Sequence, residues 1–264
     1  MRNIRIFSLI ALGCGWIGRL IDLKAGMDAG GSLGQLLWIV CPLLCMVVLR
    51  AFGGDGWRDL GIRPQVREQA LFYAISLLFS PCCALLMMWI VQANGLGTVT
   101  FSAPVLAAIG TALLPSLLKN LFEEFAWRGY LAPKVYGRGW PTWLAHAYVG
   151  LIWAAWHLPY LHLFVDPTAD WFYPRFLLGI AALSVVYGEI RLLTGSVWPA
   201  VVMHAAGNAV IDTLILRKYF VISKEYEYIL MPSPDGLLAI VFAALTGCWL
   251  YVIRMRRSAS SSAG

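Results

Sequence analysis

Most of this chain consists of apolar runs that are about as long as a membrane is thick. A helix of about 20 apolar residues crosses the roughly 30 Å hydrocarbon core of a bilayer. Because lipid offers no hydrogen bonds to a backbone, each isolated run is predicted to be an α-helix. Eight runs are predicted to span the membrane, at about Ile4–Leu23, Leu33–Phe52, Gln69–Gln92, Pro104–Leu131, Thr142–Phe164, Phe176–Ile190, Pro199–Leu216 and Gly236–Ile253.

These runs leave little polar chain from which to build a water-soluble unit. Only 13% of the residues are charged, whereas soluble domains usually carry about 25%. Eight spans with short loops use nearly all of the 264 residues, so we predict a single integral-membrane domain over residues 1–264. The predicted fold class is all-α, a polytopic transmembrane helix bundle of about eight helices. The fourth run is long for a span and the sixth is short.

The basic residues are unevenly divided between the loops at the two ends of the predicted bundle. With the N-terminus inside, the inner segments carry 12 Lys and Arg residues and the outer segments carry five. Such residues concentrate on the cytoplasmic side, so both termini are predicted to be cytoplasmic. The short loops favour a bacterial source and hence the bacterial inner membrane. This topology explains the net charge of +6, and without a base-reading motif no nucleic-acid partner is expected.

Two adjacent carboxylates lie within the fourth run, where charged groups are costly and usually face a cavity. Glu124 and Arg128 are four residues apart, in the order that favours an ion pair on a helix. Glu123 points about 100° away from Glu124, so one carboxylate can face a cavity while the other is structural. The alternative is a salt-bridge cluster at the membrane interface, in which Lys119 pairs with Glu123.

Two further motifs place polar side chains in the fifth and seventh runs. His157 ends an apolar segment, and taken alone it is better explained as a hydrogen-bonded core histidine or an interfacial one. His204 and Asn208 are four residues apart and therefore lie on one face of a helix. The small residues between them allow another helix or a substrate strand to approach closely. The alternative for this pair is a hydrogen bond between helices.

The turn between the fourth and fifth runs relates two of these motifs. Glu123 and His157 are equally distant from residue 140, which lies in the Gly- and Pro-containing segment Gly137–Pro141. Such a segment predicts a turn. Residues equally distant from a hairpin turn lie at similar depth, so these two side chains are predicted to face each other. His204 follows Pro199 by only five residues, which predicts a shallower position unless that helix begins within the membrane.

Together, the three motifs resemble the CAAX prenyl protease and bacteriocin-processing (Abi, or CPBP) family of intramembrane endopeptidases. The family pattern of EExxxR, FxxxH and HxxxN on separate helices is present as Glu123-Glu124…Arg128, Trp153…His157 and His204…Asn208. Trp153 stands where the family usually has Phe, which we interpret as a variation in packing. The segment Thr194–Pro199 is also similar to the family. The resemblance covers about residues 104–210, the predicted protease core.

The resemblance implies hydrolysis of peptide bonds. By analogy, Glu123 and His157 would hold and activate the attacking water, with Glu123 as general base. His204 and Asn208 would donate hydrogen bonds to the oxyanion of the tetrahedral intermediate. The residues that organise the site would be Glu124 and Arg128.

A divalent metal such as zinc is an alternative that the resemblance leaves open. Glu123, His157 and His204 are a plausible three-ligand zinc set with water in the fourth position. However, HExxH is absent, and the shallow position expected for His204 argues against three ligands on one ion. A metal-free mechanism is therefore slightly favoured.

The implied partners are membrane lipids and a membrane-bound or lipidated, CAAX-like peptide substrate, and the sequence makes no prediction of the oligomeric state. Because a fold does not determine an activity, the alternative function is a non-catalytic membrane scaffold or bacteriocin-immunity protein of the same fold. A transporter would use the buried charges as an ion relay. No inverted repeat or paired broken helix supports that third function.

Overall fold

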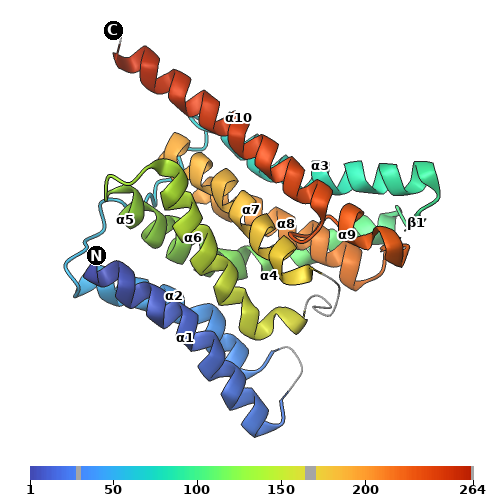
Figure 1. Cartoon of the computed structure of the whole chain (residues 1–264), viewed down its shortest axis with the longest axis horizontal. Coiled ribbons are helices and arrows are strands. Elements are labelled where there is room, and N and C mark those ends of the chain that lie inside the picture. The colour runs from blue at the N-terminus through green and yellow to red at the C-terminus, as the bar shows by residue number, and fades with distance from the viewer. Residues whose placement is uncertain (28–30, 164–170, 263–264) are drawn as a thin grey trace.

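A computed structural model describes residues 1–27, 31–163 and 171–262 of the chain (Figure 1). Its long helices are α1 (Arg2–Ala25), α2 (Leu33–Ala51), α3 (Ala70–Asn94), α4 (Ala103–Ala126), α6 (Thr142–His157), α7 (Phe172–Thr194), α8 (Trp198–Leu216) and α10 (Leu237–Ser262). The shorter elements are a π-helical turn (Trp127–Leu131), α5 (Ala132–Tyr136), 3₁₀ turns (Leu158–Leu163 and Lys224–Tyr226), α9 (Glu227–Leu230), β1 (Gly97–Val99) and β2 (Phe220–Ile222).

Seven helical segments of the described residues are long and apolar enough to cross a membrane, which confirms the predicted all-α membrane bundle. The fourth predicted run is the longest, because α4, the π-helical turn and α5 continue over Ala103–Tyr136. The fifth run is divided, since α6 has 16 residues and ends at His157. Its predicted end at Phe164 lies outside the described residues. The expectation of a short sixth span is wrong, because α7 has 23 residues.

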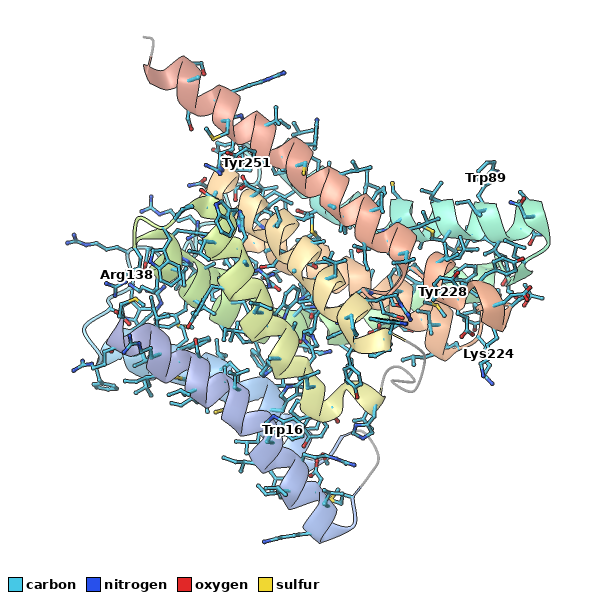
Figure 2. The ribbon with its side chains drawn as sticks, viewed as in Figure 1. Trp16, Trp89, Arg138, Lys224, Tyr228 and Tyr251 are labelled. Atoms are coloured by element: carbon cyan, nitrogen blue, oxygen red, sulfur yellow. The ribbon has the colours of Figure 1, made fainter. Side chains whose placement is uncertain are left out.

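Hydrogen bonds show which loops share an end of the bundle. Nδ2 of Asn3 donates to the carbonyl oxygen of Gly53 at 2.9 Å, and Nζ of Lys134 donates to that of Asp55 at 2.9 Å. The N-terminus, the α2–α3 loop and the end of α5 therefore meet. At the other end, β1 pairs with β2 and joins the α3–α4 and α8–α10 connections. Arg138 and Lys224 project at these opposite ends in Figure 2.

The helices bury one face and leave another apolar face exposed. Trp16 and Trp89 are 54% and 67% exposed, and they project outward from α1 and α3 (Figure 2). Inside the bundle, the rings of Trp38 and Trp156 stack with their centres 4.4 Å apart. Large apolar side chains on the outside of long helices are what a bilayer solvates, as expected for an integral membrane protein.

A buried ionic cluster joins α6, α7 and α10. Glu189 is 0% exposed, and its carboxylate accepts a hydrogen bond from Nε of Arg254 at 2.6 Å. Nε2 of His146 lies 2.9 Å from the same carboxylate, and the Tyr136 hydroxyl lies 3.1 Å from Nδ1 of His146. These contacts hold the C-terminal helix α10 against the rest of the bundle.

Arg254→Ala is expected to lower the free energy of unfolding by about 3 kcal/mol, because it leaves the buried Glu189 carboxylate without its guanidinium partner. Arg256, two residues further along α10, is exposed. Arg256→Ala is therefore the matched control and should change stability by less than about 0.5 kcal/mol. Thermal unfolding of the full chain in detergent measures both variants. Equal melting temperatures would contradict the role assigned to Arg254.

Candidate active site

A cavity of about 180 Å³ lies within the bundle and is lined by residues of α4, α6 and α8, among others. Its polar lining includes Glu123, His157, His204 and Asn208. Much of the remaining wall is apolar and comes from α3, α7 and α10. The structure therefore brings together at one cavity all four residues that the sequence predicts to be catalytic.

The contact between α4 and α8 brings the first and third motifs together. Nδ1 of His204 lies 2.8 Å from Oε1 of Glu124. One helical turn further along, Nδ2 of Asn208 donates to Oδ1 of Asn120 at 3.3 Å. These two contacts set the register of the helices and hold the third motif against the first.

Of the two positions considered for His204, the structure favours the one in which its helix begins within the bundle. The turn that begins α8 is itself buried, since Ser196 and Val197 are both 0% exposed. The α2–α3 loop covers this turn, and the carbonyl oxygen of Gly61 accepts a hydrogen bond from the Val197 amide at 2.9 Å. A helix that begins beneath a covering loop places its second turn in the interior, where His204 reaches the cavity.

Glu124 and Arg128 form the ion pair that their spacing predicts, buried behind the cavity wall. Nη1 of Arg128 lies 3.0 Å from Oε1 of Glu124, the same oxygen that contacts His204. The Arg128 guanidinium also lies over the rings of Trp153 and Tyr187, at 4.0 and 4.5 Å from their centres. Because Trp is the strongest cation–π partner, Trp153 supports Arg128 more strongly than Phe would.

Glu123 contributes the carboxylate that lines the cavity. Its Oε1 atom lies 3.7 Å from Nζ of Lys119, so the ion pair considered from the sequence is present. Oε2 of Glu123 is buried and has no hydrogen-bond partner within the described part of the chain. A buried carboxylate oxygen without a partner is costly unless something binds it, so this oxygen is suited to hold water.

Both histidines use Nδ1 to hold their rings in place. Nδ1 of His157 lies 2.7 Å from the carbonyl oxygen of Trp153, and because a carbonyl only accepts, Nδ1 carries the proton. Nδ1 of His204 donates in the same way to the Glu124 carboxylate. In each ring, Nε2 is the nitrogen left for chemistry.

The residues considered as a zinc set do not fit a three-ligand site in this arrangement. Within residues 1–27, 31–163 and 171–262, no three His, Cys, Asp or Glu side chains are grouped so that they could hold a metal ion. Three ligands at about 2.0–2.3 Å from one ion are what zinc requires. Glu123, His157 and His204 share a cavity without meeting that requirement, and Glu123 lies beside the Lys119 ammonium instead.

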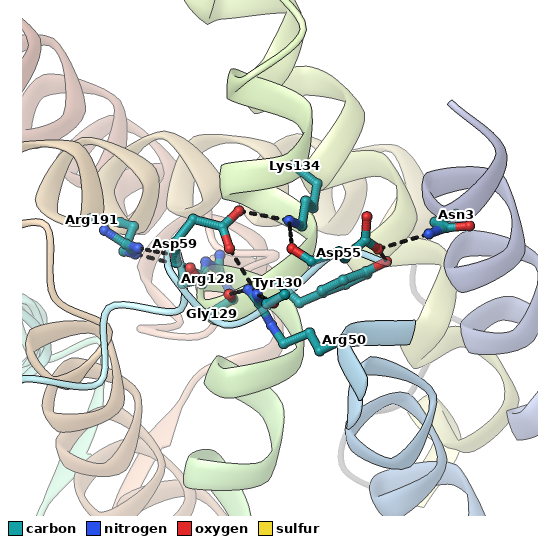
Figure 3. Close-up of polar contacts among 10 residues, drawn as sticks. Asn3, Arg50, Asp55, Asp59, Arg128, Gly129, Tyr130, Lys134 and Arg191 are labelled. Atoms are coloured by element: carbon teal, nitrogen blue, oxygen red, sulfur yellow. Dashed lines mark hydrogen bonds and ion pairs between the residues drawn. The ribbon is translucent and has the colours of Figure 1, made fainter. Parts of the chain in front are cut away.

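A π-helical turn, Trp127–Leu131, follows directly after the two glutamates. Such a turn shifts the helical hydrogen bonds by one residue and frees carbonyl groups for other donors. Two distant arginines are those donors, as Figure 3 shows. Nε of Arg191 donates to the carbonyl oxygen of Arg128 at 3.0 Å, and Nη2 of Arg50 donates to that of Gly129 at 2.5 Å. The turn that carries Arg128 is therefore held from α7 and from α2.

The α2–α3 loop braces both arginines through Asp59 (Figure 3). Nη1 of Arg50 lies 2.7 Å from Oδ1 of Asp59, and Nη2 of Arg191 donates to the Asp59 carbonyl oxygen at 2.7 Å. Burial raises the pKa of the Asp59 carboxyl, but hydrogen bonds from Arg50 and Lys134 outweigh burial and hold that pKa below its ordinary value. Asp59 is therefore ionised at neutral pH and stays paired with the arginine that supports the π-helical turn.

Arg50→Met is expected to lower the free energy of unfolding by about 1–3 kcal/mol, because the Gly129 carbonyl loses its buried donor. Arg50 is 2% exposed, whereas Arg58 on the α2–α3 loop is exposed. Arg58→Met removes the same charge without removing such a contact, and it serves as the control. If both variants melt in detergent at the wild-type temperature, Arg50 does not brace the turn.

Sequence reasoning missed several residues around the site. In the sequence, Arg50 and Arg191 are only two of the basic residues counted for the topology of the loops. Nothing in their spacing links them to Arg128. Asp212 also lines the cavity. Its place four residues after Asn208 was a usable signal, since that spacing continues the same helical face.

Comparison with known proteins bears on the same part of the chain. The family model described as Type II CAAX prenyl endopeptidase Rce1-like matches residues 104–210. This segment runs from the start of α4 into α8 and contains all three motifs. No curated protein matches the chain. The resemblance based on the motifs is thus confirmed, because residues 104–210 are similar to the Rce1-like type II CAAX prenyl endopeptidase family.

Proposed function

We propose that the chain is an intramembrane endopeptidase that hydrolyses membrane-associated or lipidated, CAAX-like peptides. The observation that carries this proposal is the meeting of Glu123, His157, His204 and Asn208, from three helices, at one cavity. The family of residues 104–210 supports peptide hydrolysis. None of the residues in the three motifs is Ser or Cys, so the proposed nucleophile is water.

Glu123 is the proposed general base. Its Oε2 atom has no hydrogen-bond partner among the described residues, so it is available to take a proton from water. Nε2 of His157 accepts the second hydrogen of that water, because Nδ1 is held by the Trp153 carbonyl. The water oxygen attacks the scissile carbonyl carbon, and the protonated Glu123 then passes its proton to the leaving amine.

His204 and Asn208 are the proposed donors to the oxyanion. Asn208 gives one amide hydrogen to Asn120 and keeps the other for the developing charge. Nδ1 of His204 donates to Glu124, so Nε2 is the ring nitrogen that donates to the oxyanion when both nitrogens carry a proton. Preorganised donors of this kind act most strongly where water is excluded.

The proposed substrate is apolar or anchored in the membrane because of what lines the cavity. Its wall includes Phe79, Ile180 and Leu183, side chains that accept lipid-like groups. Membrane lipids are the proposed surroundings. We place the protein in a bacterial inner membrane with both termini in the cytoplasm, because the end that holds the N-terminus also carries the more basic loops.

Membranes from cells that produce either the wild-type chain or Glu123→Ala provide the test. Mass spectrometry compares the peptide termini in the two samples. We expect termini that are present only with the wild type and that lie close to membrane-anchored segments. Identical termini at equal levels of folded protein would instead favour the scaffold or immunity function. Cleavage by purified protein after chelation, with the metal content measured, tests metal dependence separately.

A further inference from the structure

Asp212 is an acidic side chain in a membrane-spanning helix that the proposed mechanism does not use. It lies on α8, four residues beyond Asn208, and lines the same cavity. Carboxylates inside membrane spans are costly, face cavities and mark functional sites. Among the described residues Asp212 has no direct hydrogen bond or ion pair, although Lys119, His204 and Glu123 act on it electrostatically. Its carboxylate therefore has room for a direct cationic partner supplied by a bound peptide.

The fixed charges of the cavity leave a place for one more cation. Among the described lining residues, the Asp, Glu, Lys and Arg side chains are Glu123, Asp212 and Lys119. Nζ of Lys119 lies 3.7 Å from Oε1 of Glu123 and also acts electrostatically on Asp212, so one ammonium is shared between two carboxylates. A further cation in the cavity would therefore be stabilised by these two carboxylates, because incompletely balanced charge in such surroundings is unfavourable.

Helix α8 presents His204, Asn208 and Asp212 on one face, at intervals of about one turn. Each four-residue step advances about 6 Å along the axis, and an extended peptide advances about 3.3 Å per residue. With Asn208 at the scissile carbonyl, Asp212 lies beside a substrate position about two residues away. Because Lys and Arg side chains are long, such a residue could also reach Asp212 from a substrate position one residue nearer to or further from the scissile bond.

We propose that Asp212 forms a subsite that selects peptides with Lys or Arg within about three residues of the scissile bond. This inference rests on the proposed endopeptidase function and adds a charge preference to it. The substrate cation forms a charge-assisted hydrogen bond with Asp212, which a cavity of low dielectric strengthens. A Glu at the same substrate position would face a like charge and be rejected.

The first test uses the full-length enzyme in liposomes and a positional library of acyl-anchored, internally quenched peptides. One position at a time is fixed as Lys, Ala or Glu. For the wild type, we expect kcat/KM to be about tenfold to a hundredfold higher with Lys than with Ala at one or more positions. Glu should give the lowest values. Equal values for Lys and Ala at every position would overturn the subsite while leaving the endopeptidase function in place.

The second test changes the carboxylate. Asp212→Asn keeps the shape of the side chain and removes its charge, so the Lys-to-Ala ratio of kcat/KM should fall to about one. Asp212→Lys should reverse the order and favour Glu peptides. Glu225→Gln removes one charge from an exposed residue outside the cavity and should keep the wild-type ratio. A Lys preference that survives in Asp212→Asn would overturn the proposal.

A binding measurement separates failure of the subsite from failure of the proposed function. Fluorescence anisotropy with the Glu123→Gln chain compares the affinities of Lys and Ala peptides without cleavage. If the wild type cleaves nothing but Lys peptides still bind about tenfold more tightly, and Asp212→Asn abolishes the difference, the subsite stands and the endopeptidase function fails. Absence of both cleavage and selective binding would overturn both.

Discussion

Glu123→Gln is expected to lower kcat for an acyl-anchored peptide by about a hundredfold to ten-thousandfold, with little change in KM. Gln keeps the shape of the side chain but cannot take a proton from water, and general-base catalysis contributes rate factors of this size. The fold should survive, because the lost ion-pair partner Lys119 is 29% exposed and lies 3.7 Å away, a contact of small net value. Steady-state cleavage in liposomes measures both constants.

The control for this variant is Glu225→Gln, which makes the same chemical change on an exposed residue outside the cavity. Its kcat should equal that of the wild type. Melting temperatures of all three proteins show whether any loss of activity comes from unfolding. If Glu123→Gln turns over substrate at the wild-type rate, Glu123 is not the general base. Its contact with Lys119 would then be only structural.

Asn208→Ala is expected to lower kcat by about a hundredfold to a thousandfold, which is the usual cost of removing one oxyanion donor. The donor acts on charge that develops only in the transition state, so KM should change little. Asn208 donates one amide hydrogen to Asn120. Its second amide hydrogen is the proposed donor to the oxyanion, and the substitution removes it. Cleavage of the same liposome-bound peptide measures the effect.

The matched control is Asn120→Ala, which removes the acceptor of the interhelical hydrogen bond but keeps the amide of Asn208. If Asn208 acts on the oxyanion, Asn120→Ala should retain most of the wild-type kcat. The sequence left open that Asn208 serves only to join two helices. Equal losses of kcat and of melting temperature in both variants would support that structural alternative.

The contacts within one helix were predictable because helical spacing is fixed. The pairs Glu124–Arg128 and Lys119–Glu123 are each four residues apart, and both are present at 3.0 and 3.7 Å. Glu123 and His157 also reach one cavity, as their equal distance from the turn near residue 140 predicts. These inferences needed only the helical repeat and one hairpin.

Contacts between segments that are distant in the chain could not be predicted from the sequence. The sequence left the depth of His204 open, because it does not show that a loop that follows α2 buries the turn at which α8 begins. The support of the π-helical turn by Arg50 and Arg191 was not predicted either. A π-helical turn changes the register of a helix by one residue, and side-chain spacing alone does not reveal which distant donors fill the carbonyls that it frees.

By itself, the sequence determined that this chain is a bundle of membrane-spanning helices and that its polar motifs are similar to those of the Rce1-like type II CAAX prenyl endopeptidase family. Both conclusions follow from local properties, namely the length of apolar runs and residue spacing along a helix. Only the tertiary structure decided that His204 binds Glu124, that Glu123 and Asp212 line one cavity, and that no three-ligand metal group forms among the described residues. Those facts depend on the register and depth at which separate helices pack, which distant side chains and covering loops set together.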